Sequence, residues 1–310
     1  MAKIIVTGVD GNFGGLVVDT ITKLVDKESL ILTCPFEAGL EKFKKEGFDT
    51  RVANFNHREG LEKAFEGGDV ILVISAPFVG EKRQTAHKNA VDAAKAAGVK
   101  KVVYTSLVNA TDPQNPSIEK IDHAFTEEYV QSIGMDYIFL RNSQYAEAMI
   151  TSYLTSNGAM ASCQGDGKMS YISRKDCAIA AAYALTKEEM HKRILNINGP
   201  ESLTLAEFIA IGNEKTGMNV VLNDVSEEDV YHFFDSIGVP RTTEGQFEKD
   251  SPAPYSSDGM VTFARAIRLD KMSEFTNDFE LLTGTKPRTI AHMFANYDEY
   301  QVGQRNSTDN

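Results

Sequence analysis

The sequence has few cysteines and a shortage of basic residues, and each shortage excludes a class of protein. The cysteines, Cys34, Cys163 and Cys177, are far apart and odd in number, so they indicate no disulfide framework and are expected to be reduced. Lys and Arg total 32 against 44 Asp and Glu, which gives a formal net charge of -12. Nucleic acids and anionic membranes bind to basic faces, so neither is an expected partner of this chain.

Signals for membranes, secretion and metals are also missing. No apolar stretch approaches the roughly 18 residues of a membrane-spanning helix, and the N-terminus lacks the layout of a signal peptide. The histidines form no H-x-H or H-E-x-x-H pattern and the cysteines form no C-x-x-C, so no metal site is expected. No G-x-S-x-G or Cys-His arrangement points to nucleophilic catalysis. We expect a cytoplasmic protein, either a monomer or a homodimer.

Short apolar runs alternate with helical patterns through the first half of the chain. Strands are expected at 4–7, 30–34, 50–53, 70–74, 102–105 and 137–140, and helices at 40–46, 59–65, 83–97 and 118–132. The strands are apolar on both faces, as a parallel sheet covered by helices requires. This alternation predicts an α/β protein with a Rossmann-type, doubly wound parallel sheet.

The second half of the chain is less regular. Its patterns suggest a strand-turn-strand at 157–173, helices at 174–186, 202–217 and 226–240, and a strand at 194–198 that can rejoin the main sheet. Ser226 and Asp229 form a capping box at the start of the last helix. Residues 241–259 are expected to form a loop and residues 305–310 to fray.

These elements suggest two domains. The predicted dinucleotide-binding domain spans 1–155 plus roughly 174–200. A smaller C-terminal α/β substrate domain would span 201–310 plus roughly 156–173.

The stretch VTGVDGNFGG, residues 6–15, joins the first strand to an apolar helical segment. Gly8 permits a tight turn, Gly11 lets the backbone approach a pyrophosphate, and Gly14 lets the helix pack on the sheet. The helix N-terminus presents free N–H groups and the positive end of its dipole. The stretch therefore predicts a dinucleotide phosphate site, the alternative being a glycine-rich turn that binds nothing.

Further blocks resemble a known family in order and spacing. They are AHKNAVDAAKAAGVKKVVYTSL (86–107), GMDYIFLRNSQYAEAM (134–149) and GDGKMSYISRKDCAIAAAYAL (165–185). Together with the glycine stretch they resemble, over residues 1–240, the NmrA-like atypical short-chain dehydrogenases and reductases, whose bacterial members include NADPH-dependent quinone oxidoreductases and triphenylmethane reductases. The resemblance implies NAD(P)H as cofactor and a small planar molecule as substrate.

The sequence departs from that family at the positions that distinguish cofactors. Asp10 stands where the family has a small or hydroxyl residue, and Pro35 and Gly39 stand where NADPH-using relatives have an Arg and a Lys for the 2′-phosphate. The sequence therefore leaves NADH and NADPH both open. Asn54 replaces an Asp near the adenine and can still form a hydrogen bond. The Tyr-x-x-x-Lys proton donor is absent from 118–132, where Glu128 takes the position of a Lys in quinone-reductase relatives.

Ligands of doubly wound sheets bind at the carboxyl ends of the strands. The expected cofactor-binding residues are accordingly Thr7, Gly8, Asp10, Gly11, Asn12, Phe13, Gly14, Pro35, Asn54, Ser75, Ala76, Ser106 and Asn142. Phe78 and Tyr145 are candidate walls for a planar substrate, or else core residues.

The candidate catalytic residues are His123, Glu128 and Tyr145. By the resemblance, His123 aligns with a histidine of the quinone reductases, and a neutral imidazole there could donate to a carbonyl oxygen. The alternative is a surface or capping histidine. Glu127 and Glu128 are expected on a solvated face, unless one of them orients His123.

The leading hypothesis is a reductase that transfers hydride to a quinone or an enone. The missing Tyr-x-x-x-Lys fits such acceptors, because a hydroquinone anion can collect its proton from water. One alternative is a redox sensor that binds dinucleotide without turnover. Another is a non-redox isomerase or lyase that uses His123 and Glu128 as acid–base groups.

Overall fold

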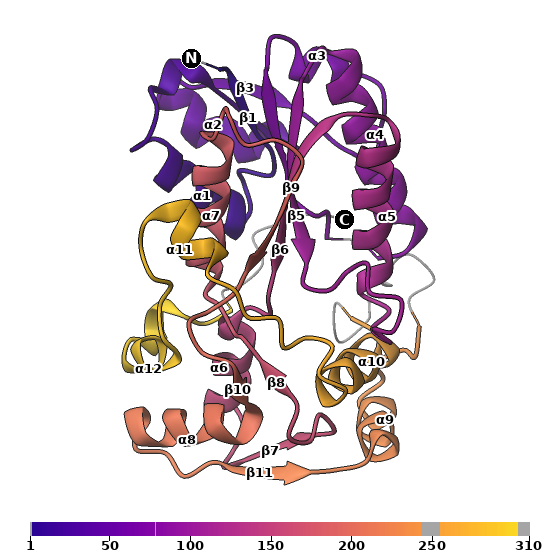
Figure 1. Ribbon diagram of the computed structural model, residues 1–310, viewed down its shortest axis with the longest axis vertical. Coiled ribbons are helices and arrows are strands. Elements are labelled where there is room, and N and C mark those ends of the chain that lie inside the picture. The colour runs from indigo at the N-terminus through magenta and orange to yellow at the C-terminus, as the bar shows by residue number, and fades with distance from the viewer. Residues whose placement is uncertain (1, 78, 243–254, 303–310) are drawn as a thin grey trace.

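A seven-stranded, all-parallel sheet runs through the centre of the protein's larger part (Figure 1). The computed structural model describes residues 2–77, 79–242 and 255–302. The strand order is β3-β2-β1-β4-β5-β6-β9. The strands are β1 (Ile4–Val6), β2 (Leu30–Cys34), β3 (Asp49–Val52), β4 (Val70–Val73), β5 (Lys101–Leu107), β6 (Asp136–Asn142) and β9 (Arg193–Ile197). The predicted Rossmann-type sheet is confirmed, including the late strand that returns to its edge.

The centre of the sheet consists of strands that are buried along their whole length. Every residue of β1, β2 and β4 is buried, and Ile4 of β1 pairs with Leu30 on one side and Val70 on the other. From β1 the chain first builds outward through β2 to β3, and then crosses back to β4. The strand order therefore reverses beside β1, which opens a crevice at the carboxyl ends of these strands.

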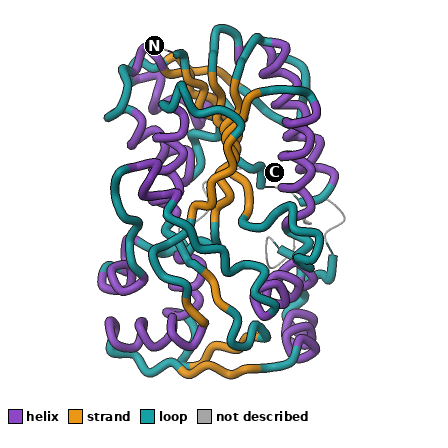
Figure 2. The backbone as a smooth tube through the Cα atoms, viewed as in Figure 1, coloured by secondary structure: helices purple, strands orange, loops and turns teal. Residues whose placement is uncertain are grey.

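Helices cover both faces of the sheet (Figures 1 and 2). One face carries α1 (Asn12–Ile21), α2 (Glu37–Lys45), α7 (Arg174–Leu185) and α11 (Asp278–Thr283), and the other carries α3 (Leu61–Phe65), α4 (Glu81–Ala96) and α5 (Lys120–Ser132). Helix α7 presents a row of buried alanines, among them Ala178 and Ala181, which lets it pack closely against α1. The two faces form separate apolar cores.

A smaller group of elements lies beyond the carboxyl ends of the strands, at the bottom of Figure 1. It comprises α6 (Ala146–Leu154), β7 (Ala159–Ser162), β8 (Lys168–Met169), β10 (Leu203–Thr204), α8 (Leu205–Thr216), β11 (Val221–Asp224), α9 (Glu227–Ser236), α10 (Ser257–Arg268) and α12 (Ile290–Ala295). The remaining elements are two short 3-10 helices, η1 (Lys27–Ser29) and η2 (Tyr297–Glu299).

Several local predictions hold in this smaller part and others do not. Ser226 and Asp229 form the predicted capping box of α9, and α8 ends at Gly217 with a φ of +74°. The strands predicted within 157–173 exist, but they do not pair with each other, since β7 pairs with β11 and β8 with β10. The predicted loop over 241–259 is wrong at its end, because α10 starts at Ser257 with Ser256 as its cap. Residues 243–254 and 305–310 lie outside the described part.

Two helices pack on the other side of the predicted division between domains. Helix α11 falls in the predicted substrate domain, but it packs against α7 and β9, and its Phe279 and Leu282 belong to a core of the main sheet. Helix α6 falls in the predicted dinucleotide-binding domain, but its Ile150 and Tyr153 belong to the core of the smaller part. The division itself stays a prediction.

Candidate functional site

A cavity of about 250 Å³ lies at the carboxyl ends of β1, β2, β3 and β4. Its wall consists of Thr7, Gly8, Asp10, Gly11, Asn12, Phe13, Gly14, Pro35, Ala53, Asn54, Phe55, Asn56, Ile74, Ser75, Ala76 and Pro77. Every predicted cofactor-binding residue is in this wall except Ser106 and Asn142. Asp10 is the only charged residue among the described residues that form it.

The glycine turn keeps side chains out of one side of this cavity. Gly8 has a φ of +61°, which favours glycine, and a Cβ at Gly14 would lie 2.6 Å from the Gly8 carbonyl carbon and 2.8 Å from Val9 Cα. Helix α1 starts directly after the turn, and its cap residue, Gly11, provides no side chain to its first N–H groups. Uncapped N–H groups at a helix start, beside a turn without side chains, fit a pyrophosphate.

Asp10 projects from this turn toward the end of β2. A Cβ built on Gly39 would lie 2.7 Å from Asp10 Cβ and 2.8 Å from Cys34 Sγ, so the absence of a side chain at position 39 makes room for the aspartate. Burial raises the pKa of the Cys34 thiol to about 12, with the Asp10 and Glu37 carboxylates adding to the shift. Pro35 follows β2 in the cavity wall.

The segment after β4 is fixed by buried side chains. Ser75 N donates to Thr105 Oγ1 at 2.8 Å, and Ala76 N donates to His87 Nε2 at 2.9 Å. Because Nε2 accepts, the imidazole proton lies on Nδ1, which donates to Thr126 Oγ1 at 2.8 Å. Burial lowers the pKa of His87 to about 3, so the ring is neutral and this wall of the cavity is fixed.

A second group of contacts ties the start of α4 to α5. The Asp122 carboxylate accepts from Gly80 N and from Gln84 Nε2, each at 2.8 Å, and lies 3.6 Å from the Arg83 guanidinium. Arg83 Nε donates to the carbonyl of Ala76 at 3.1 Å. The network stabilises the segment that borders the cavity.

Ser106 and Asn142 are buried and do not line this cavity, and their role in cofactor binding stays a prediction. Ser106 Oγ donates to Glu127 Oε1 at 2.6 Å, and Asn142 Nδ2 donates to the Tyr145 hydroxyl at 3.3 Å. Glu127 also pairs with Arg141 at 2.6 Å and is only 1% exposed. The prediction that Glu127 lies on a solvated face is therefore wrong, because it is the buried partner of Arg141.

His123 lies on α5 and is half-buried, with its Nδ1 2.9 Å from the Tyr104 hydroxyl on β5. Burial and the nearby Arg83 cation hold the pKa of His123 well below its usual value, so the ring is neutral. Glu128 is exposed. Five residues along a helix turn the side chain by roughly 140°, so Glu128 points away from the side of α5 that carries His123, and its catalytic role stays a prediction.

Tyr145 stacks on Phe13, which is in the wall of the cavity. Its ring lies 6.4 Å from the Phe13 ring at an angle of 22°, and the Arg174 guanidinium lies 5.7 Å from its centroid. Burial raises the pKa of the Tyr145 phenol, which is neutral as a result. The stack offers a flat apolar surface beside the glycine turn. Phe78, the other predicted aromatic wall, lies outside the described residues.

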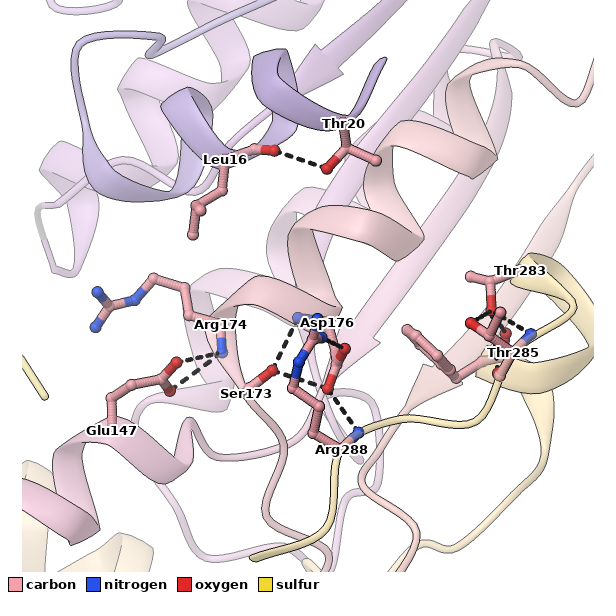
Figure 3. A network of polar contacts seen from close by, with 10 residues as sticks. Leu16, Thr20, Glu147, Ser173, Arg174, Asp176, Thr283, Thr285 and Arg288 are labelled. Atoms are coloured by element: carbon pink, nitrogen blue, oxygen red, sulfur yellow. Dashed lines mark hydrogen bonds and ion pairs between the residues drawn. The ribbon is translucent and has the colours of Figure 1, made fainter. Parts of the chain in front are cut away.

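The backbone of Arg174 is fixed by a polar network at the start of α7 (Figure 3). The Glu147 carboxylate accepts from Arg174 N at 2.8 Å. Ser173 Oγ accepts from Asp176 N at 2.9 Å, and the Asp176 carboxylate also binds the backbone N and the guanidinium of Arg288. The network joins α6, α7 and the segment before α12.

The described residues show neither a metal centre nor a membrane-spanning helix. They contain no group of three or more His, Cys, Asp or Glu side chains placed to hold a metal ion. No helix among them is both long and apolar enough to span a membrane.

The strand order, the glycine turn and the cavity at the reversal of that order define a Rossmann-type fold with a nucleotide-sized site. The model of the NmrA-like family matches residues 1–252, and the chain belongs to that family. The family prediction made from the sequence is thus confirmed.

Named relatives and solved structures agree with this assignment. Quinone oxidoreductase 2 of Escherichia coli (strain K12) is 28% identical over 294 residues, which cover 94% of this chain and 98% of that protein. The crystal structure of the E. coli NADPH-dependent quinone oxidoreductase complexed with NADPH has a TM-score of 0.85 at 26% identity, covering 95% of this chain and 99% of that one. Citrobacter sp. triphenylmethane reductase complexed with NADP(H) has a TM-score of 0.82 at 28% identity, covering 95% and 99%. These relatives are reductases or oxidoreductases by name, in agreement with the expected enzyme class.

Sequence reasoning missed the residues that fix the site. His87, Tyr104 and Asp122 are buried polar residues on elements that are otherwise apolar or amphipathic. A polar residue at a buried position of a helix or strand is the signal that could have singled them out. Their partners could not be read from the sequence, because each partner lies on another element.

Proposed function

We propose that this chain is an NAD(P)H-dependent reductase of a small planar acceptor of the quinone or enone class. The observation that carries the proposal is the cavity at the strand-order reversal, with the side-chain-free glycine turn and the uncapped start of α1 in its wall. The NADPH-complexed relative at 26% identity over 95% of this chain supports it. A cytoplasmic location and a monomeric or homodimeric state belong to the same proposal.

Different residues of the cavity wall would contact different parts of the dinucleotide. Gly11 and the first N–H groups of α1 would face the pyrophosphate. Asn54 and Phe55, after β3, would border the adenine, with Asn54 Oδ1 held by Asn56 N at 3.0 Å. When bound, the dinucleotide supplies the hydride.

The acceptor would lie against the stack of Phe13 and Tyr145. Phe13 lines the cavity and Tyr145 stacks against it, and flat aromatic faces suit a planar ring system. The protein's contribution is to orient the acceptor and to exclude water on this side.

His123 is our candidate proton donor for the acceptor oxygen. When the Tyr104 hydroxyl donates to Nδ1, the ring proton lies on Nε2, where it is available for donation. The balanced reaction is NAD(P)H, a proton and a quinone giving NAD(P)⁺ and the hydroquinone.

Calorimetric titration of the purified chain with NADH and with NADPH tests the proposal first. We expect micromolar binding of at least one of them, followed by loss of the reduced-nicotinamide absorbance when menadione is added. The Gly14→Ala variant serves as the control with weakened binding, because its added Cβ would clash with the backbone of the glycine turn. Absence of binding of either dinucleotide at millimolar concentration would overturn the proposal, and tight binding without turnover of any acceptor would favour the redox sensor instead.

A further inference from the structure

The hydroxyl of Tyr104 lies behind His123, our candidate proton donor. Tyr104 is on β5 and is fully buried, and its hydroxyl oxygen is 2.9 Å from His123 Nδ1 on α5. The two rings lie 5.9 Å apart at an angle of 36°. Tyr104 also meets the ring of His87 edge-on at 5.4 Å, and His87 holds Ala76 N of the cavity wall. Tyr104 therefore connects His123 to the segment that borders the cavity.

His123 carries a single ring proton, and the chemistry of the ring depends on which nitrogen holds it. Burial and the nearby Arg83 cation keep the pKa of His123 well below its usual value, so the ring is neutral. In a neutral imidazole one nitrogen donates and the other accepts, and the hydrogen bond of one nitrogen decides the role of the other. His123 can donate to a ligand from Nε2 only when its Nδ1 accepts.

The groups around the Tyr104 hydroxyl favour this arrangement. The phenol hydrogen is buried and needs an acceptor. Thr126 Oγ1 already accepts from His87 Nδ1 at 2.8 Å and donates to a backbone carbonyl of its own helix at 2.8 Å, and Ser75 Oγ has no partner within hydrogen-bond distance. The acceptor that the geometry offers is His123 Nδ1. If Nδ1 instead donated to the phenol, the phenol hydrogen would have to share Thr126 Oγ1 or remain unpaired, and either costs free energy.

We propose that Tyr104 is a positioning residue for the reduction: its hydroxyl donates to His123 Nδ1 and so keeps the imidazole proton on Nε2. His123 is half-buried, and because Nδ1 faces the buried phenol, the Nε2 side of the ring is the one that can face the acceptor. Tyr104 itself is buried behind the ring and acts only through it. The inference rests on the proposed function, since His123 is the candidate donor of that reaction.

Imidazole nitrogen NMR of the full chain with isotope-labelled histidine measures the tautomer directly, without cofactor or acceptor. We expect His123 in the Nε2–H form and His87 in the Nδ1–H form, because Ala76 N donates to His87 Nε2. In Tyr104→Phe, His123 should become a mixture of both forms, while His87 keeps its form and serves as the internal control. The signals that are missing from His123→Gln assign the resonances.

Steady-state kinetics with menadione, and with whichever dinucleotide binds, measure the consequence. Tyr104→Phe should lower kcat about tenfold and leave the KM of menadione within about twofold, because the ring that contacts the acceptor is still present but is no longer held in one form. Tyr137→Phe is the matched control, because Tyr137 stacks on the same Phe139 that Tyr104 contacts, but its hydroxyl accepts from Gln131 at the surface. It should leave both the tautomer and kcat unchanged.

The outcomes separate this inference from the proposed function. Wild type with the His123 proton on Nδ1, or a Tyr104→Phe variant that does not change both the tautomer and kcat, would overturn the inference while the reductase activity stands. A wild type that binds neither dinucleotide, or that reduces no acceptor, overturns the proposed function.

Discussion

Two adjacent glycines of α1 offer a sharp test of the glycine turn, because one added methyl group should have opposite effects at the two positions. A Cβ at Gly14 falls within contact distance of the Gly8 carbonyl, 2.6 Å from its carbon, and 2.8 Å from Val9 Cα. A Cβ at Gly15 meets nothing closer than the Val9 carbonyl oxygen, at 3.8 Å, which is an ordinary contact. Both residues are helical, so the backbone conformation allows alanine at each.

The magnitudes follow from this geometry. Overpacking of a tight site costs about 1–3 kcal/mol. Alanine in place of a helical glycine gains roughly 0.5–1 kcal/mol. The atoms near Gly14 are backbone atoms of the turn and cannot rotate away, so the cost should be at the upper end of its range. We expect Gly14→Ala to lower the free energy of unfolding by about 2 kcal/mol, and Gly15→Ala to raise it by about 0.5–1 kcal/mol.

Urea unfolding followed by circular dichroism measures both changes, and calorimetry with NADH and NADPH measures the consequence for the site. Gly14→Ala should also weaken dinucleotide binding, because the methyl group moves the turn away from the pyrophosphate position. Gly15→Ala should bind as the wild type does. The reasoning is refuted if both variants change stability in the same direction by similar amounts, or if Gly14→Ala binds dinucleotide unchanged.

Three further predictions concern buried polar groups and the aromatic stack. Arg141→Met leaves Glu127, only 1% exposed, without its cation, and should destabilise the fold by about 3–5 kcal/mol in urea unfolding; a loss under 1 kcal/mol contradicts this. The pKa of His87 is about 3 in the folded chain and 6.5 ordinarily, so the stability due to the neutral ring is complete above pH 6.5 and is lost as the pH falls toward 3. His87→Gln should therefore flatten the dependence of unfolding free energy on pH between 6 and 4 by about 1.4 kcal/mol per pH unit, and an unchanged slope would refute the assignment. Tyr145→Phe keeps the ring against Phe13 and should change kcat/KM for menadione by less than about twofold, whereas Tyr145→Ala should lower it more than about tenfold; equal losses would mean that the hydroxyl, not the ring, matters.

Local patterns determined much of this protein. The apolar runs of β1, β2 and β4 are buried on both faces in any parallel sheet, so their composition alone predicts the fold class. The spacing of Gly8, Gly11 and Gly14 is equally local, because the turn and the helix start involve only neighbours in sequence. The predicted cofactor residues of the first strand and turn accordingly all lie in the cavity wall.

Contacts between distant segments decided the rest. Glu127 looked solvated beside Glu128, but it is buried because Arg141 and Ser106, on two strands of the sheet, surround it. The strands β7 and β8 looked like a hairpin, but each found a later partner, in β11 and β10. No periodicity within a segment encodes such a partner, since periodicity gives only the face that is buried.

The same distinction applies to the cofactor. The sequence showed that Asp10 stands in a phosphate-binding turn and that Pro35 and Gly39 offer no cation, which left its role open. Only the tertiary structure placed Asp10 against Gly39 and Cys34, at the end of β2. Positions 10, 34 and 39 lie on three elements that pack together, and the charge that a ligand meets there is a property of that packing, not of any one segment.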